Sequence, residues 1–216
     1  METKDISKAV IARLPRYYRY LGELLNEGTE RISSGELSVK MNVTASQIRQ
    51  DLNKFGGFGQ QGYGYNVRYL RDEIGKILGL DEQHPMVIIG AGNLGQAIAN
   101  AYKSIDRGFR LTGIFDKNPD LEGKQVAGMG VRMMEELPAF IQKENIRIAA
   151  LMLPKESSQE VADLVTQNGV KAIWNFSHRD LNVAPDVSVE NVHLSDSLMT
   201  LLYSLSGYRK GESSES

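Results

Sequence analysis

Hydrophobic positions recur at helical spacing through the first part of the chain. Tyr17, Leu21 and Leu24 fall on one face of a helix that we expect over residues 16–27, and Gly28 ends it. A serine or threonine precedes each of the next two apolar stretches, where its side chain can cap a helix. The pattern therefore predicts three more helices, over about residues 34–41, 45–55 and 67–78.

A glycine-rich segment separates the last two of these helices. Five of the eleven residues from Phe55 to Tyr65 are glycine, and aromatic residues stand between them. Glycine permits sharp turns and a close approach of the backbone to a partner, so the segment can form an ordered wing. A flexible linker is the alternative. The structured stretches on both sides favour the wing.

Beyond residue 82 the pattern changes to short apolar runs that alternate with helical stretches. Strands in this alternation form a parallel sheet with helices on both faces, so we predict an α/β, doubly wound Rossmann domain. The expected strands are residues 86–90, 110–116, 147–153, 171–176 and 187–194, and the expected helices are 93–103, 135–143 and 156–167.

The chain closes with a helix that is apolar almost all round, and with a polar tail. The helix carries Leu198, Met199, Leu201, Leu202 and Leu205, and the tail is expected to be disordered. The expected organisation is an N-terminal domain of residues 1–82, a Rossmann domain of residues 83–194, a helix of residues 195–207 and a tail of residues 208–216.

Composition excludes several classes of function. The 216 residues are 41% hydrophobic and 24% charged, which is ordinary for a globular protein, and none is cysteine. Disulfides, thiolate catalysis and cysteine metal sites are thereby excluded, and any redox sensing must use a bound cofactor. The three histidines lack metal-ligand spacing. Because the polar start is not a secretory signal and no apolar run could span a membrane, we expect a cytoplasmic protein without metal.

The net charge of −2 gives no direct sign of a nucleic-acid partner. A local cluster of Lys4, Lys8, Arg13, Arg16 and Arg19 has only one acidic neighbour, Asp5, in the same stretch. This cluster can meet phosphates, but a solvated helix face explains it equally well.

The segment from Gly90 to Gly95 matches the GxGxxG dinucleotide pattern. It follows an apolar strand and opens a helix, whose free N–H groups can bind phosphates. Asp116, at the end of the next strand, would accept hydrogen bonds from ribose hydroxyls and repel a 2′-phosphate, which favours NAD over NADP. A solvated turn residue is the alternative for Asp116, and Lys117 could serve a 2′-phosphate. The candidate cofactor residues here are Gly90, Ala91, Gly92, Asn93, Leu94, Gly95, Asp116 and Lys117.

Catalysis is not expected, although the nucleotide motif is common in dehydrogenases. The Rossmann stretch leaves no room for a substrate domain, and no acid–base pair stands at a telling spacing. A small NAD-dependent oxidoreductase and a CoA-binding module remain as rival interpretations. Neither rival accounts for the N-terminal helices and the wing.

Residues 34–55 fit a helix-turn-helix, in which the second helix enters the major groove with its first turns. Arg49 can contact a phosphate or guanine, and Gln47 or Gln50 can pair with adenine through two hydrogen bonds. The candidate DNA-binding residues, those of the wing included, are Ser34, Thr44, Ser46, Gln47, Arg49, Gln50, Lys54, Gln60, Gln61 and Gly62.

These motifs together resemble the redox-sensing transcriptional repressors of the Rex family. The resemblance rests on RLPxYxRxL from Arg13, TAxQIRxDLxxFG from Thr44, GxxGxGY from Gly59, and GxGNLGxA from Gly90 with Asp116. It implies a homodimer with winged-helix and Rossmann domains and with a C-terminal helix swapped between subunits. It also implies that the protein binds a palindromic operator with NAD⁺ or without nucleotide, and that NADH releases it.

The resemblance further implies residues that sense the nicotinamide and couple the two domains. The nicotinamide end is expected near Pro154, Asn175, Phe176 and residues 191–194, where an apolar pocket would favour uncharged NADH over cationic NAD⁺. Arg19, Tyr102 and His193 are the coupling candidates. His193 stands where the family often has an acidic residue, Tyr102 matches with a one-residue offset, and Gln50, Gln60 and Gln61 replace residues that are commonly basic.

Overall fold

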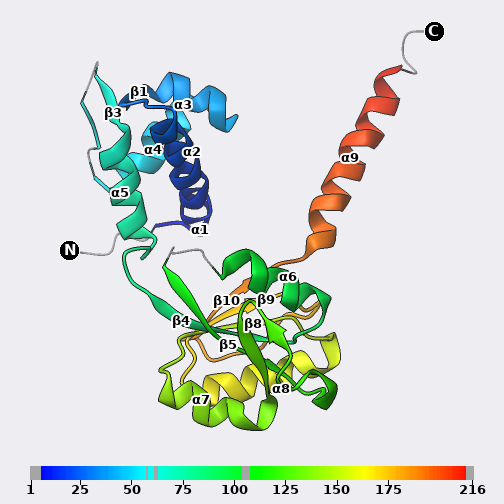
Figure 1. The fold of residues 1–216 in the computed structure, drawn as a ribbon. Coiled ribbons are helices and arrows are strands. Elements are labelled where there is room, and N and C mark those ends of the chain that lie inside the picture. The colour runs from blue at the N-terminus through cyan, green and yellow to red at the C-terminus, as the bar shows by residue number, and fades with distance from the viewer. Residues whose placement is uncertain (1–5, 57, 61–62, 104–107, 213–216) are drawn as a thin grey trace. The chain divides into compact units, whose positions relative to one another are not determined.

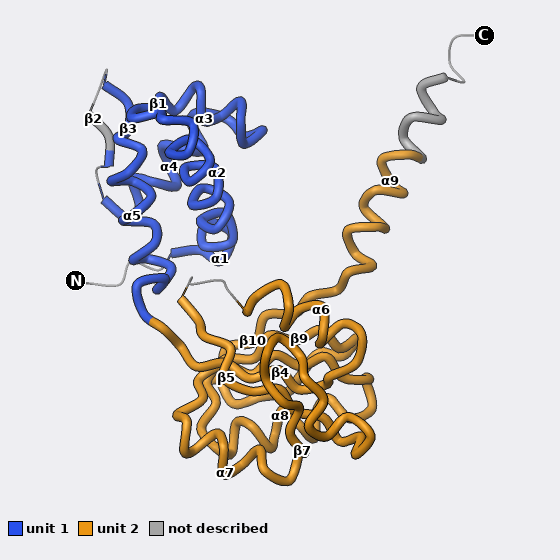
Figure 2. Tube along the Cα trace, viewed as in Figure 1, with its two compact units in different colours: residues 1–82 blue, residues 83–216 orange. Residues whose placement is uncertain are grey.

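The computed structural model describes residues 6–56, 58–60, 63–103 and 108–212. The chain divides into two compact units, residues 1–82 and residues 83–216 (Figure 2). The division falls at the boundary expected between the N-terminal and Rossmann domains. Each unit is described by itself below.

The first unit holds five helices and three short strands within its described residues (Figure 1). The four expected helices are present, and a short N-terminal helix and a first strand join them. The elements are α1 (Lys8–Ile11), α2 (Leu14–Asn26), β1 (Arg31–Ile32), α3 (Ser34–Met41), α4 (Ala45–Asn53), β2 (Gly59–Gln60), β3 (Gly64–Asn66) and α5 (Val67–Ile77).

Local side-chain caps set the ends of α3 and α4. Ser33 and Glu36 form a capping box at the start of α3, and Asn42 ends that helix in the left-handed conformation with φ of 50°. Thr44 Oγ1 accepts a hydrogen bond from the N–H of Gln47 and starts α4. The tight helix-turn-helix therefore follows from residues whose side chains satisfy the free backbone groups of the helix ends.

The glycine-rich segment forms part of an antiparallel sheet in the order β1-β3-β2. Gly64 has a φ of +68°, and a Cβ there would lie 2.6 Å from the carbonyl oxygen of Ile32, so only glycine fits. The described part of the segment is therefore a wing and not a flexible linker. β3 runs into α5 without an intervening residue, and Asn66 caps that helix by accepting a hydrogen bond from the N–H of Tyr69.

The core of the first unit lies between its helices. Apolar side chains from α2, α3, α4 and α5 are fully or almost fully buried there, as the helical spacing predicted. The cluster comprises Leu14, Tyr17, Leu21, Leu24, Ile32, Leu37, Met41, Ile48, Leu52, Tyr65, Val67, Leu70 and Ile74.

The second unit alternates strands and helices. The expected strands and helices are present with shifted ends, and a β6–β7 hairpin is added that the apolar pattern did not predict. The elements are β4 (His84–Ile89), α6 (Asn93–Tyr102), β5 (Phe109–Asp116), η1 (Pro119–Leu121), β6 (Gln125–Val126), β7 (Met129–Met133), η2 (Met134–Glu136), α7 (Leu137–Lys143), β8 (Ile148–Leu151), α8 (Lys155–Gln167), β9 (Ala172–Asn175), β10 (Ser188–Asn191) and α9 (Leu194–Glu212).

The sheet of this unit has the order β10-β9-β8-β4-β5-β7-β6, and only β6 runs antiparallel to its neighbour. The parallel strands are arranged as two halves that diverge from β4 and β8, which is the order of dinucleotide-binding folds. Ligands bind such sheets at the carboxyl ends of the strands where the order reverses. The predicted Rossmann fold is confirmed, and its strand order reverses between β4 and β8.

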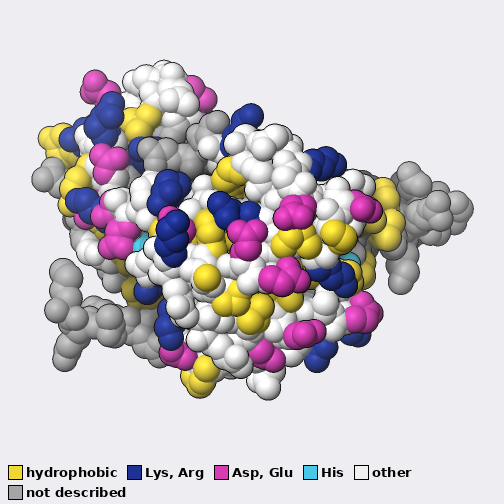
Figure 3. All heavy atoms as spheres, turned by 60° about the horizontal axis from the view of Figure 1, so that its bottom comes forward, with side chains coloured by type: hydrophobic (Ala, Val, Ile, Leu, Met, Phe, Trp, Pro, Cys, Tyr) yellow, Lys and Arg dark blue, Asp and Glu magenta, His cyan; other side chains and the backbone are white. Residues whose placement is uncertain are grey.

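Helices cover both faces of the sheet (Figure 1). Val87 and Ile89 of β4 pack in one apolar cluster with α7 and α8, whereas Met86 and Ile88 pack in a second cluster with α6. Successive strand residues point to opposite faces, so a continuous apolar strand is buried on both sides. The space-filling view shows acidic and basic side chains interspersed on one face of the molecule, as the small net charge leads one to expect (Figure 3).

The last helix, α9, extends to Glu212, which corrects the expected end at residue 207 and the expected disorder of residues 208–212. Arg209 and Lys210 are good helix formers, and extending an existing helix costs far less than starting one, so Gly207 does not end it. Residues 213–216 lie outside the described part. No helix among the described residues is long and apolar enough to cross a membrane.

Candidate functional site

The turn between β4 and α6 requires two of its three glycines for steric reasons. Gly90 has a φ of +102°, and a Cβ there would lie 2.3 Å from the carbonyl oxygen of Met152. A Cβ on Gly95 would lie 1.9 Å from the carbonyl oxygen of Gly90. These glycines let the turn close and let α6 pack against it.

Gly92 has a different environment. A Cβ there would meet no heavy atom of the described residues within 4 Å, so the space beside it is open. Gly92 begins α6 without a side chain to cap the helix, and the next residues, Asn93 and Leu94, are exposed. Their backbone N–H groups can therefore bind the pyrophosphate of a dinucleotide.

Asp116 points toward this turn from the end of β5. Its Oδ2 accepts a hydrogen bond from the N–H of Ala91 at 2.6 Å, and its Oδ1 accepts one from the N–H of Asn118 at 2.8 Å. Gln96 supports the same turn, because its Nε2 donates to the carbonyl oxygen of Ala91 at 2.7 Å. Asp116 is thus half-buried beside the turn, and Lys117 is exposed.

The residues expected at the nicotinamide end follow β8 and β9. Pro154 is exposed and precedes α8, and Phe176 lies edge-on to Trp174 with ring centroids 4.6 Å apart. Asn175 is fully buried, and both ends of its amide are engaged within the protein. Its Oδ1 accepts hydrogen bonds from the N–H and hydroxyl of Ser177, and its Nδ2 donates to the carbonyl oxygen of Arg179 and to Asn191 Oδ1.

The sheet topology brings these segments to one edge. Gly90 follows β4, Asp116 ends β5, Pro154 lies shortly after β8, and Asn175 ends β9, all at the carboxyl ends of parallel strands. The internal bonds of Asn175 show that it holds the loop after β9 in place. Sequence reasoning missed the supporting role of Gln96, which no motif marks.

The helix-turn-helix presents most of its expected side chains to solvent. Thr44, Ser46, Arg49 and Gln50 are exposed, while Ile48 is fully buried on the opposite face of α4. Exposed polar residues in the first turns of such a helix are those that can reach base edges in the major groove.

Arg49 links the two helices of this motif. Its Nη1 donates a hydrogen bond to Ser34 Oγ, 2.9 Å away, at the start of α3. Two candidate DNA contacts, one from each helix, are thereby brought together. Lys54 is exposed at the end of α4.

Gln47 differs from the expectation that it pairs with adenine. It is half-buried, and its Nε2 donates to Asp51 Oδ1 at 2.8 Å, because Asp51 lies one helical turn further along the inner face of α4. Asp51 also accepts two hydrogen bonds from Arg13 and one from the hydroxyl of Tyr17. The sequence analysis did not single out Asp51. Its signal is a carboxylate between the apolar positions Ile48 and Leu52.

Electrostatics at Asp51 favour the charged carboxylate. Burial alone would raise its pKa, but hydrogen bonds from Arg13, Gln47 and Tyr17 outweigh burial and hold the pKa below its usual value. Burial first, and then the charge of Asp51, raise the pKa of Tyr17 above its ordinary value. The cluster therefore contains an ionised carboxylate and a protonated phenol at neutral pH.

The wing is only partly described. Gln60 lies in β2 and pairs with Gly64 of β3, whereas the candidate residues Gln61 and Gly62 lie outside the described residues. At the base of the wing, Arg31 Nη1 donates to the carbonyl oxygen of Tyr63 at 3.1 Å. Arg31 is a basic residue of the wing region that the sequence analysis did not consider.

Comparisons with known proteins match both units. Residues 5–53 match the family model "Putative DNA-binding protein N-terminus", and residues 81–179 match the model "CoA binding domain". The redox-sensing transcriptional repressor Rex of Clostridium novyi (strain NT) is 56% identical over 96% of this chain and 100% of its own. Rex of Thermoanaerobacter sp. (strain X514) is 59% identical over 93% of this chain and 89% of its own. The chain belongs to the Rex family of transcriptional repressors.

Solved structures agree with membership of the Rex family. RSP in complex with β-NAD⁺ and operator DNA has a TM-score of 0.89 and 55% identity, covering 98% of this chain and 97% of its own. RSP in complex with β-NADH has a TM-score of 0.90 and 52% identity, covering 98% of this chain and 99% of its own.

The Rex relatives are named as repressors, which favours a transcriptional regulator over the rival interpretation of an oxidoreductase. The CoA model covers only the second unit and leaves the DNA-binding unit unexplained.

The three expected coupling residues of this Rex protein lie in different units. Arg19 belongs to the first unit, where its guanidinium lies 5.3 Å from the ring centroid of Tyr20. Tyr102 and His193 belong to the second. Tyr102 contacts the rings of Phe109 and Trp174, and His193 stacks on His178, with centroids 5.9 Å apart and ring planes 13° apart. Coupling between Arg19 and the other two stays a prediction.

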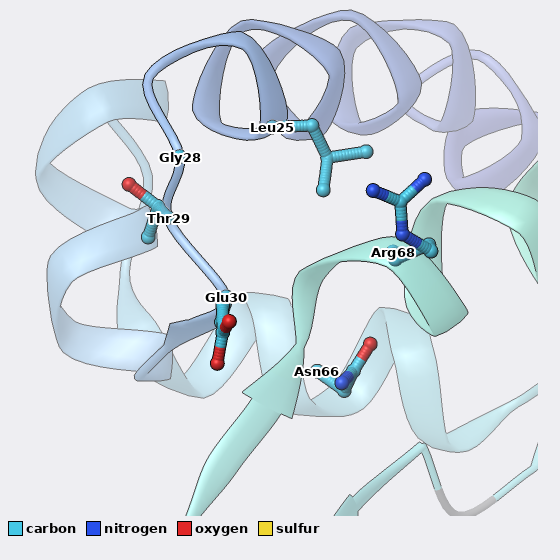
Figure 4. A pocket seen from close by; sticks show the side chains of 6 residues that line it. All are labelled: Leu25, Gly28, Thr29, Glu30, Asn66 and Arg68. Atoms are coloured by element: carbon cyan, nitrogen blue, oxygen red, sulfur yellow. The ribbon is translucent and has the colours of Figure 1, made fainter.

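A pocket of about 460 Å³ lies in the first unit, outside both predicted sites (Figure 4). The side chains of Leu25 and Arg68 extend toward each other there. No motif in the sequence pointed to it. Its lining residues are Leu25, Gly28, Thr29, Glu30, Asn66 and Arg68.

Proposed function

We propose that this chain binds operator DNA through α4 and the wing and binds NAD(H) at the carboxyl edge of its parallel sheet. One observation carries the nucleotide half of the proposal: Asp116 is bonded to Ala91 in a turn where only glycine fits at positions 90 and 95. The RSP complexes with NAD⁺ and operator DNA and with NADH support both ligands.

The proposed response is release of DNA when NADH binds. A ligand shifts a conformational equilibrium only if it binds the two conformations with different affinity. The two redox forms differ at the nicotinamide ring, which is cationic in NAD⁺ and uncharged in NADH. Phe176 and the loop that Asn175 holds after β9 are the proposed site where this difference is read.

We also propose that the protein acts as a homodimer in which α9 is exchanged. Leu198, Met199 and Leu201 of α9 are between 56% and 60% exposed, which leaves a large apolar surface without cover. The second unit also has an apolar groove of about 320 Å³ on its sheet. The α9 helix of a second copy suits this groove because both surfaces are apolar. The groove is lined by Met86, Phe109, Ile148, Ala172, Ile173, Trp174, Ser188, Val189 and Glu190.

A dimer of this kind implies a palindromic operator. Two recognition helices related by a two-fold axis contact half-sites about 34–36 Å apart. We place the protein in the cytoplasm, where it reaches its DNA, and we expect no metal cofactor. Among the described residues, no three His, Asp or Glu side chains are grouped as metal ligands.

Fluorescence anisotropy tests the proposal directly. A labelled palindromic fragment from the gene's own promoter is titrated with protein alone, with NAD⁺ and with NADH at fixed salt. We expect tight binding that NADH abolishes and NAD⁺ preserves. Asp116→Ala, measured in parallel, should bind DNA but require a higher NADH concentration for release. Equal binding under all three conditions would contradict the proposed sensing.

A further inference from the structure

The carboxylate of Asp51 lies at the centre of a buried polar cluster in the first unit. Asp51 is fully buried, and each of its oxygens accepts two hydrogen bonds. Oδ2 accepts from Arg13 Nε at 2.7 Å and from the Tyr17 hydroxyl at 3.0 Å. Oδ1 accepts from Arg13 Nη2 at 2.8 Å and from Gln47 Nε2 at 2.8 Å. The carboxylate therefore has no acceptor capacity left for another partner.

This cluster joins two helices. Arg13 stands immediately before α2 and Tyr17 lies within it, whereas Gln47 and Asp51 belong to α4. A bidentate arginine–carboxylate pair fixes direction as well as distance, so it sets the rotation of α4 about its own axis. That rotation decides which side chains of α4 face outward.

Gln47 gives its donor group to this cluster. Reading adenine with glutamine takes both the NH₂ group and the carbonyl oxygen of the amide. One N–H of the Gln47 amide donates to the fully buried Asp51, so the intact cluster holds this half-buried amide inward and away from the outer face of α4. Gln50, three residues further on, is exposed and has its amide on the outer face.

We propose that Gln47, Arg13 and Asp51 are positioning residues that orient α4, and that base discrimination falls to Ser46, Arg49 and Gln50. The proposal rests on the proposed DNA-binding function and adds a division of labour within α4. Removing a positioning residue lowers the fraction of protein in the binding orientation, which weakens binding to every sequence alike. Removing a reading residue changes the preference at particular base pairs.

A panel of operator fragments, each with one base pair of the half-site changed, separates the two roles. Affinities are measured by anisotropy for the wild-type chain, for Gln47→Ala and for the matched control Gln50→Ala on the same helix. We expect Gln47→Ala to weaken binding by roughly tenfold on every fragment, equivalent to one lost hydrogen bond to a charged group. Gln50→Ala should erase the preference at one or two positions. Loss of preference at a single base pair in Gln47→Ala would overturn the proposal.

A second measurement decides the position of Gln47 without DNA. In ¹⁵N-labelled full-length protein, the side-chain NH₂ protons of Gln47 should exchange with water more slowly than those of Gln50. Asp51→Asn, with folding checked by circular dichroism, should speed the exchange at Gln47 only. Equal exchange at the two glutamines in the wild-type chain would contradict the proposal. Failure of the wild type to bind any fragment would instead refute the DNA-binding function, and slow exchange would still support the cluster.

Discussion

The carboxylate of Asp116 holds the backbone N–H of Ala91 at 2.6 Å. The bond ties the end of β5 to the glycine-rich turn after β4, so contacts within the protein help to hold the shape of the turn. A site that is already ordered loses little conformational entropy when its ligand arrives, which favours tight binding. Asp116 therefore supports the turn and also offers oxygens beside it.

Asp116→Ala is expected to lower NADH affinity by about 10- to 100-fold, because it removes a charged partner of the ribose and the bond to Ala91. The chain contains one tryptophan, Trp174, and quenching of its emission by NADH reports binding. Lys143→Ala is the control, since Lys143 is an exposed lysine at the end of α7, outside the predicted cofactor site, and should change affinity little. Unchanged affinity in Asp116→Ala would show that the ribose is held elsewhere.

Gly92→Ala should lose nucleotide binding but keep its stability, whereas Gly95→Ala should lose stability. The space beside Gly92 is open, so Gly92→Ala should change the free energy of unfolding by less than about 0.5 kcal/mol but obstruct the pyrophosphate. Gly95→Ala forces its Cβ against the backbone of Gly90, and we expect a loss of about 1–3 kcal/mol. Thermal melts with and without NADH distinguish the two. A Gly92→Ala protein that NADH still stabilises fully would contradict this account.

The stability of the first unit should depend on the protonation of Asp51. Its pKa is lower in the folded protein than the usual value of about 3.9, so the charged form stabilises the fold. This contribution is complete above about pH 4 and is lost as the pH falls through the folded pKa. We expect the unfolding free energy of the wild type to fall below pH 4 by up to about 1.4 kcal/mol per pH unit from this group.

Asp51→Asn provides the comparison for that prediction. The variant should be less stable at pH 7, because the Arg13 guanidinium loses its charged partner, and its stability should fall less steeply in acid. Other carboxylates titrate in both proteins, so the difference between the two curves isolates Asp51. Parallel curves between pH 5 and pH 2 would show that Asp51 is not the source.

Substitution in α9 tests the proposed dimer. Leu201→Glu places a charge on an apolar surface, and we expect the dimer to dissociate at least about tenfold more readily, since burying a leucine side chain stabilises by about 1.5–3 kcal/mol. Analytical ultracentrifugation over a concentration series measures the shift. Ser204→Glu adds the same charge at a polar position of the same helix. Equal effects of the two substitutions would mean that apolar contacts of Leu201 do not hold the dimer.

Much of the fold follows from local signals in the sequence. Ser33 and Thr44 each precede a helix that they cap, and Gly90 and Gly95 stand where a side chain would collide with backbone. These features depend on neighbours in the chain or on a motif with a known shape. Asp116 was predictable for the same reason, because its distance from the motif is fixed by one helix and one strand.

Features that leave no strong local signal in the sequence were not predictable. The bonds of Gln47 to Asp51 and of Asp51 to Arg13 join residues up to 38 positions apart, and an outward glutamine on α4 has the same helical pattern. The β6–β7 hairpin has strands of two and five residues, too short for an apolar period to show. The extension of α9 to Glu212 reflects helix propagation past a glycine, which a stop signal read alone misses.

The direct passage from β3 into α5 has a mechanical consequence. Asn66 is both the last residue of a wing strand and the cap of the helix, so no flexible joint separates them. The wing strand β3 and the helix α5 therefore move together as one rigid piece. Since the chain continues from α5 into the second unit, a rotation of α5 applied at Ile77 is transmitted to β3 at the other end of the helix. Movement of the wing is thus coupled to the C-terminal end of α5.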